Sequence, residues 1–167
     1  IKTYVLVADN ADVTLTSSAQ DTILVEIYTD DGIIGYGETD TNPWVAKALI
    51  DSPGTHTMDQ SMKDILIGKD PLDISKRWEE LYIGTAMTGR RGAGVNAIGA
   101  IDMALWDIKG KYENKPVYQL LGGNVHENIT PYASLQPLGS SFEEYRDSLV
   151  EWAEKARNLG FKAVKSE

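Results

Sequence analysis

The pattern that most constrains the fold lies at the carboxyl-terminal end of the sequence. Residues 129–135 and 161–164 are rich in β-forming residues, and residues 141–160 between them carry apolar side chains at helical spacing. Two strands joined through a helix are expected to pair in parallel as a βαβ unit. One such unit cannot bury both faces of its sheet, so we expect residues 124–167 to be the incomplete start of an α/β domain.

The expected helix at residues 141–160 has recognisable ends. Ser141 and Glu144 predict a capping box, and Gly160 predicts the carboxyl-terminal cap. Its expected apolar stripe consists of Phe142, Tyr145, Leu149, Trp152, Ala156 and Leu159.

The first part of the chain predicts a small antiparallel sheet. Residues 2–8, 22–28 and 33–36 are expected strands, and Asp31-Gly32 supplies the positive-φ position of a tight hairpin between the last two. Residues 9–20 are polar and are expected to form a long mobile loop. These segments predict a three-stranded meander.

Helical patterns follow the meander. We expect helices at residues 59–66, ended by Gly68, and at residues 72–82, begun by Asp70 and Pro71. Residues 93–112 predict a long helix whose small residues let other backbones approach, and residues 116–121 a short one before Gly122-Gly123. Residues 1–123 therefore predict a complete α+β domain.

Composition excludes several classes of protein. The 16 basic and 25 acidic residues give a net charge of −9, which disfavours binding to nucleic acid. The absence of cysteine removes disulfides and thiolate chemistry, and no apolar run is long enough for a membrane helix. We expect a cytoplasmic protein that binds neither membrane nor nucleic acid.

Four short segments together resemble a known family. They are Gly37-Glu38 after the hairpin, AIGAIDMALWD at residues 97–107, Lys109-Gly110-Lys111, and PVYQLLGG at residues 116–123. This series resembles the amino-terminal domain of the mandelate racemase/muconate lactonizing enzyme branch of the enolase superfamily.

The resemblance implies a fold and a cofactor. Residues 1–123 would be the α+β capping domain, a three-stranded antiparallel meander plus helices, and residues 124–167 the first βαβ unit of a truncated (β/α) TIM-type barrel. Two mobile loops, residues 9–20 and about 39–57, would close over the substrate. Three acidic Mg²⁺ ligands would come from later barrel strands, beyond residue 167, so no metal ligand is assigned in this chain.

The resemblance also assigns candidate site residues. Lys165 matches the first lysine of a Lys-x-Lys motif at the end of the second barrel strand, and Glu167 stands where the second, the usual general base, would be. Both are candidate catalytic residues, while Trp44 and His56 in the second loop are candidate substrate contacts. The pattern alone also fits a solvated lysine, a surface histidine and an ordinarily packed tryptophan.

The implied reaction is removal of a proton α to a carboxylate, most readily in the dehydration of an acid sugar. Glutamate at position 167 weakens the racemase alternative, which needs a base on each face, and cycloisomerisation stays open. A non-catalytic capping or assembly module is the other alternative. Expected partners are a carboxylate substrate, the rest of the barrel or a complementary chain, and further copies in a homo-oligomer; the isolated chain is expected to be inactive.

Two acidic residues in the long helix are also candidates for a metal site. Asp102 and Asp107 are five positions apart, about 140° around the helix, which makes a shared metal difficult. We expect capping or ion pairing within the domain instead.

Overall fold

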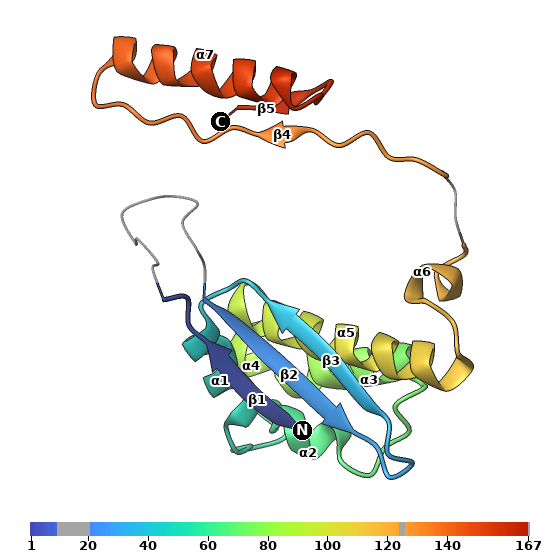
Figure 1. The fold of residues 1–167 in the computed structure, drawn as a ribbon. Helices are drawn as coiled ribbons and strands as arrows, with labels where there is room; N and C mark the ends of the chain where they lie inside the picture. The colour runs from blue at the N-terminus through green and yellow to red at the C-terminus, as the bar shows by residue number, and fades with distance from the viewer. Residues whose placement is uncertain (10–20, 124–125, 167) are drawn as a thin grey trace. The chain divides into compact units, whose positions relative to one another are not determined.

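The computed structural model describes residues 1–9, 21–123 and 126–166 of the chain. The chain divides into two compact units, Ile1–Gly123 and Asn124–Glu167, and each is described by itself (Figure 1). In the described residues no helix is both long and apolar enough to cross a membrane.

The first unit contains the expected antiparallel meander. Strands β1 (Lys2–Leu6), β2 (Thr22–Tyr28) and β3 (Ile34–Thr39) lie in the order β1-β2-β3. The hairpin turn closes through the Thr29 N–H and the Ile33 carbonyl, 3.0 Å apart, and Gly32 adopts a φ of 83°. The expected loop at residues 9–20 lies outside the described residues apart from Asp9.

Six helices of the first unit are described: α1 (Pro43–Asp51), α2 (Met62–Leu66), α3 (Ile74–Gly84), α4 (Ala86–Gly89), α5 (Ala93–Glu113) and α6 (Val117–Leu120). The long helix expected at residues 93–112 is confirmed and extends by one residue. It ends where Asn114 takes a left-handed conformation with a φ of 52°.

Three expected boundaries are wrong. Residues 39–57 are not one loop, because Asn42 and Pro43 begin helix α1 there. Helix α2 begins at Met62 and not at residue 59, because the Ser61 hydroxyl caps it. Helix α3 begins at Ile74, because the Asp70 carboxylate accepts the Leu72 N–H at 2.9 Å and closes a turn ahead of the helix.

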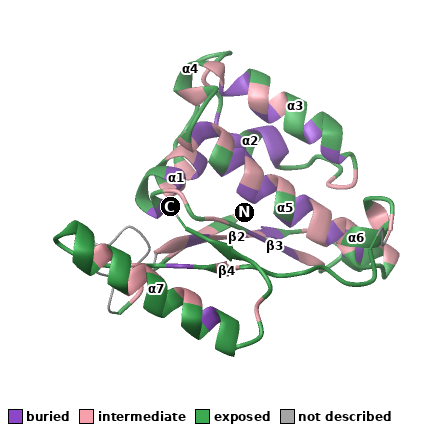
Figure 2. Ribbon diagram, turned by 90° about the horizontal axis from the view of Figure 1, so that it is seen from above, coloured by how far each residue is buried: buried purple, intermediate pink, exposed green. Residues whose placement is uncertain are grey.

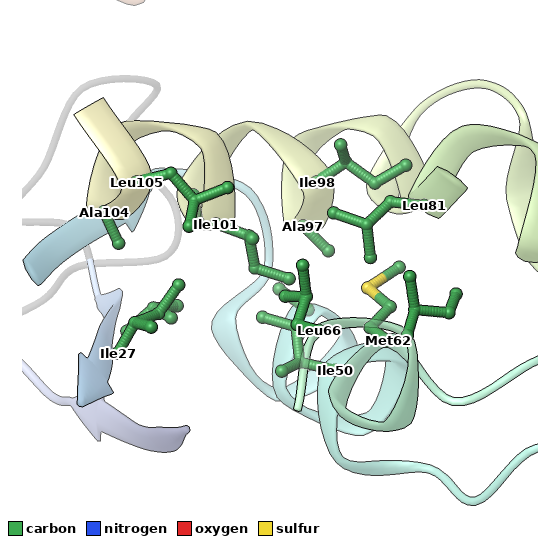
Figure 3. Packing of buried hydrophobic residues seen from close by; sticks show 14 of the residues in the cluster. Ile27, Ile50, Met62, Leu66, Leu81, Ala97, Ile98, Ile101, Ala104 and Leu105 are labelled. Atoms are coloured by element: carbon green, nitrogen blue, oxygen red, sulfur yellow. The ribbon is translucent and has the colours of Figure 1, made fainter. Parts of the chain in front are cut away.

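The core forms where α5 crosses the sheet (Figure 3). Ile98, Ile101 and Leu105 of α5 are buried together with Ile27 of β2 and Leu81 of α3. Strand β3 lies close to α5: a Cβ placed on Gly35 would be 2.1 Å from the Ala104 carbonyl oxygen. The small residues of the helix therefore bring the sheet and helix backbones close together, as the sequence predicts.

The exposed edge of β3 is also tied to α5. The Asp107 carboxylate accepts the Tyr36 N–H at 2.8 Å, and the Lys111 ammonium donates to the Ile34 carbonyl at 2.7 Å. Lys111 and Asp107 form an ion pair of 2.6 Å. These side chains satisfy backbone groups that an edge strand otherwise leaves open.

The second unit is a βαβ unit, which confirms the fold class. Strands β4 (Ala133–Ser134) and β5 (Val164–Lys165) pair in parallel, with Ala133 opposite Val164, and helix α7 (Phe142–Asn158) connects them. Both strands are shorter than expected. Among the described residues of this unit, each strand pairs only with the other one. Pro131 has no N–H, so it cannot donate a hydrogen bond that would extend the pairing toward residue 129.

Helix α7 has the expected ends with one change. The Ser141 hydroxyl accepts the Glu144 N–H at 3.2 Å, but the Glu144 carboxylate accepts from the N–H and hydroxyl of Ser140. Gly160 follows the helix with a φ of 89°. Figure 2 shows most of α7 exposed, and within its expected apolar stripe only Ala156 is buried.

Candidate functional site

Trp44 lies in the first turn of α1 and not in a loop. The Asn42 side-chain oxygen accepts the N–H groups of Trp44 and Val45 at 3.1 and 3.2 Å, and Pro43 supplies a helical φ at the first position. The Trp44 side chain is 60% exposed. This indole is therefore an apolar surface held at a fixed place on a helix, available to a ligand or to another part of the protein.

His56 lies in the segment between α1 and α2, where the chain makes a short antiparallel bridge. The Thr55 N–H donates to the Asp59 carbonyl at 2.8 Å, and the Asp59 N–H donates to the His56 carbonyl at 3.0 Å. The imidazole is exposed, and its Nδ1 accepts the Met58 N–H at 3.2 Å. The backbone of this segment is thus held by hydrogen bonds, which fix the position of the His56 Cα.

Asp59 anchors this segment, a role that the sequence analysis missed. Its carboxylate accepts the Thr55 hydroxyl at 2.5 Å and also the hydroxyl of Thr88 in α4. These hydroxyl groups hold the pKa of Asp59 below its usual value. Nothing in the local pattern indicates a partner 29 positions away, so only the fold could reveal the contact with Thr88.

Lys165 is the last residue of β5. It lies opposite Ser134 in β4, its carbonyl accepts the Leu135 N–H at 2.9 Å, and its side chain is exposed. The carboxyl ends of parallel strands are where barrel enzymes place their reactive groups. The position predicted for Lys165 is therefore present, while Glu167 lies outside the described residues.

The four candidates fall into two groups. Trp44, in α1, and His56, in the segment after α1, belong to the first unit. Lys165 belongs to the second unit, with Glu167 two positions further along the chain.

The described residues do not form a metal site. No group of three or more His, Asp or Glu side chains among them is arranged to hold a metal ion. Asp107 is engaged with Lys111 and Tyr36, as expected for an ion-paired residue. Burial raises the pKa of Asp102, and Trp106 hydrogen-bonds to its carboxylate, which makes it a structural group of the helix.

A cavity of about 550 Å³ lies beside the β2–β3 hairpin. The hairpin residues Thr29 and Asp30 line it, together with Leu72, the buried Arg77 and Tyr112. Neither Trp44 nor His56 contributes to its wall. The cavity is therefore separate from the candidate contact residues.

Comparison with known proteins gives the class of the chain. Residues 3–122 match the mandelate racemase / muconate lactonizing enzyme, N-terminal domain. With the second unit, the fold is that capping domain followed by the first βαβ unit of a (β/α) barrel. The chain belongs to the mandelate racemase/muconate lactonizing enzyme family of the enolase superfamily.

The individual relatives have names that refer to different reactions. The chain is 36% identical to a D-galactonate dehydratase family member of Streptomyces bingchenggensis (strain BCW-1), over 99% of the chain and 37% of the relative. It is 35% identical to the 3,6-anhydro-D-galactonate cycloisomerase from Zobellia galactanivorans. Its structure matches the crystal structure of that enzyme with a TM-score of 0.75, over 99% of the chain and 41% of the enzyme.

A third relative was solved with a metal. The chain is 26% identical to a racemase from Streptomyces coelicolor A3(2) with bound magnesium, with a TM-score of 0.72 over 98% of the chain and 44% of that structure. The chain thus spans between 37% and 44% of the length of these three proteins.

Proposed function

We propose that this chain is the cap and the opening of the barrel of a Mg²⁺-dependent enzyme that dehydrates an acid sugar. One observation carries the proposal: the identity to a member of the D-galactonate dehydratase family runs over 99% of the chain, through both units. The similarity therefore includes the strand that ends at Lys165 as well as the capping domain.

The proposed reaction begins at the carbon next to the substrate carboxylate. A base takes the proton from that carbon, and the hydroxyl of the following carbon leaves as water. The resulting enol rearranges to an α-keto acid, so the product is lighter than the substrate by one water. Such a reaction needs a positioned base and a stabilising positive charge for the developing anion.

Lys165 and Glu167 are the proposed barrel-side residues. The Lys165 ammonium at the end of β5 would face the substrate and stabilise the negative charge that proton removal creates. Glu167, two positions further on, would exchange a proton with the substrate or orient its hydroxyl groups. A single strong base on the opposite face, from another part of the enzyme, would then suffice for dehydration.

Trp44 and His56 are the proposed cap-side contacts. Trp44 offers an exposed apolar surface in α1, and His56 an exposed polar ring in the segment after α1. The described residues of this chain do not form a metal site. The Mg²⁺ ligands are therefore proposed to come from the part of the enzyme that corresponds to the rest of the longer relatives. Mg²⁺ would supply charge stabilisation for the anion.

Cycloisomerisation is the second candidate, because the similarity to the Zobellia galactanivorans enzyme also covers 99% of the chain. An isomerase leaves the mass of its substrate unchanged, whereas dehydration removes one water. The two proposals are therefore separated by the mass of the product.

The test uses the whole protein that contains this chain. It is incubated with a panel of aldonic and aldaric acids and their lactones, with Mg²⁺ or with EDTA, and the products are analysed by mass spectrometry. Mg²⁺-dependent loss of one water supports the proposal, and a product of unchanged mass supports the second candidate. No turnover in any combination favours the non-catalytic module. Residues 1–167 alone are proposed to be inactive.

A further inference from the structure

We infer that His56 is presented to the ligand as a fixed hydrogen-bond donor, with the neutral ring held in its Nε2–H form. We infer further that Asp59 and Thr88 are positioning residues for it. The ligand class, an oxygen-rich acid, rests on the proposed function. The tautomer of the imidazole ring does not depend on the proposed function.

The tautomer follows from the contact with Met58. A backbone N–H can only donate, so the Nδ1 atom that it reaches at 3.2 Å must accept with a lone pair. In neutral imidazole the proton is then on Nε2. Among the residues that the structure describes, no hydrogen-bond partner is recorded for Nε2, and the side chain is exposed.

The donor to the ring is itself held from its other side. The Met58 carbonyl accepts the Met87 N–H at 3.0 Å. Two residues further on, the Gln60 N–H donates to the Gly84 carbonyl at 2.8 Å. Met58, whose N–H orients the imidazole, is thus bonded through its carbonyl to α4, and Gln60 is bonded to the last residue of α3.

The Asp59 carboxylate completes this attachment. It accepts hydroxyl hydrogen bonds from Thr55, next to His56 in sequence, and from Thr88 in α4. Because these bonds lower the pKa of Asp59, the group stays ionised and acceptor-only at neutral pH. We name the set Thr55, Asp59 and Thr88 the threonine clip.

A fixed Nε2–H donor selects for a particular chemistry. It matches a carboxylate or hydroxyl oxygen of an acid sugar and offers no acceptor to an ammonium group. Glutamine is the substitution that best retains a donor at this reach, whereas asparagine places its amide nearer the position of Nδ1.

The experiment is a long-range ¹H–¹⁵N correlation spectrum of the imidazole rings in the ¹⁵N-labelled chain. It is recorded at about pH 8.5, well above the ordinary imidazole pKa of about 6.5. The chain has two histidines, so His126 is an internal comparison. We expect one pyridine-type and one pyrrole-type nitrogen for His56, assigned to Nδ1 and Nε2. Averaged nitrogens, or the reverse assignment, would overturn the inference.

A matched pair of variants tests the clip. Thr88→Val removes the hydroxyl that Asp59 accepts, while Thr57→Val makes the same change in the same segment at a hydroxyl without a recorded bond. We expect Thr88→Val to move the His56 nitrogens toward their average and Thr57→Val to leave them unchanged, with backbone amide spectra reporting that both remain folded. An unchanged His56 signature in a folded Thr88→Val variant would refute the role of the clip.

This measurement needs no substrate. An enzyme that dehydrates no acid sugar but shows the expected signature would refute the proposed function alone. An active enzyme with averaged His56 nitrogens would refute this inference alone.

Discussion

Gly37 of β3 lies directly against the backbone of α5 at Ala100. A methyl group on its Cα would be 1.9 Å from the Ala100 carbonyl oxygen, so alanine at position 37 must push the strand and the helix apart. We predict that Gly37→Ala lowers the free energy of unfolding by about 3 kcal/mol, measured by urea denaturation.

Gly99 provides the matched control for this prediction. It lies in the same helix as Ala100, and a Cβ there would meet nothing within 4 Å. Gly99→Ala should therefore stabilise the chain by about 0.5–1 kcal/mol through helix propensity. Equal effects of the two substitutions would contradict the close packing of β3 on α5.

Asp51 connects β1, α1 and α2 through charge. Burial tends to raise its pKa, but hydrogen bonds from Lys47, Lys63 and Thr3 outweigh this effect and hold the pKa below the usual value. A carboxylate with a lowered folded-state pKa stabilises the fold above its unfolded-state pKa of about 3.9, and the contribution is lost as the pH falls through the folded-state value.

We therefore predict that Asp51→Asn costs about 1–2 kcal/mol at pH 7 and less at acid pH, so its stability curve is flatter below about pH 4. Urea denaturation at a series of pH values measures this. Asp40→Asn removes the same charge from an exposed position and should leave the wild-type pH dependence in place. The same flattening in both variants would count against the network.

Asp107 stabilises the edge of β3 chiefly as a hydrogen-bond acceptor for the Tyr36 N–H. We predict that Asp107→Ala costs about 1 kcal/mol, and that Asp107→Asn costs less because the amide oxygen can still accept. Thermal or urea unfolding compares the two. If both variants lose the same stability, the ion pair with Lys111 carries the effect instead.

Trp44 is exposed on α1, so its removal should affect ligand binding more than folding. In the whole protein, Trp44→Ala is predicted to raise KM for the acid sugar while changing the free energy of unfolding by no more than about 0.5 kcal/mol. Val45→Ala, the adjacent exposed position, should leave both quantities unchanged. A KM equal to that of the wild type in Trp44→Ala would remove Trp44 from the proposed site.

Much of the fold was predictable from local pattern. The hairpin at Gly32 and the helix that contains Ile98 and Leu105 follow from turn chemistry and apolar spacing, which act over a few residues. Helix α1 lies inside the segment that the family resemblance implies is a loop, although Asn42 and Pro43 are residues typical of a helix start. At this position the local residue types indicate the helix correctly, and the family resemblance indicates a loop, which is wrong.

The candidate site was less predictable. The position of Lys165 at the end of a parallel strand follows from the βαβ pattern, whereas Trp44 lies in a helix and not in the expected loop. The contact between Asp59 and Thr88 was not predictable, because it joins residues from distant segments that only the folded chain brings together. The turn at Asp70 is a local contact, but an aspartate ahead of a helical pattern favours a helix cap and a turn alike, so the pattern alone did not separate the two.

Lys165 is proposed to end a barrel strand of an acid-sugar dehydratase, where its ammonium stabilises the anion formed from the substrate. The most direct measurement is the rate of Mg²⁺-dependent α-keto acid formation by the whole protein and by its Lys165→Met and Lys162→Met variants. We predict a loss of at least about 100-fold in Lys165→Met and a nearly unchanged rate in Lys162→Met, because Lys162 precedes β5. Keto-acid formation that is as fast in Lys165→Met as in Lys162→Met would contradict it.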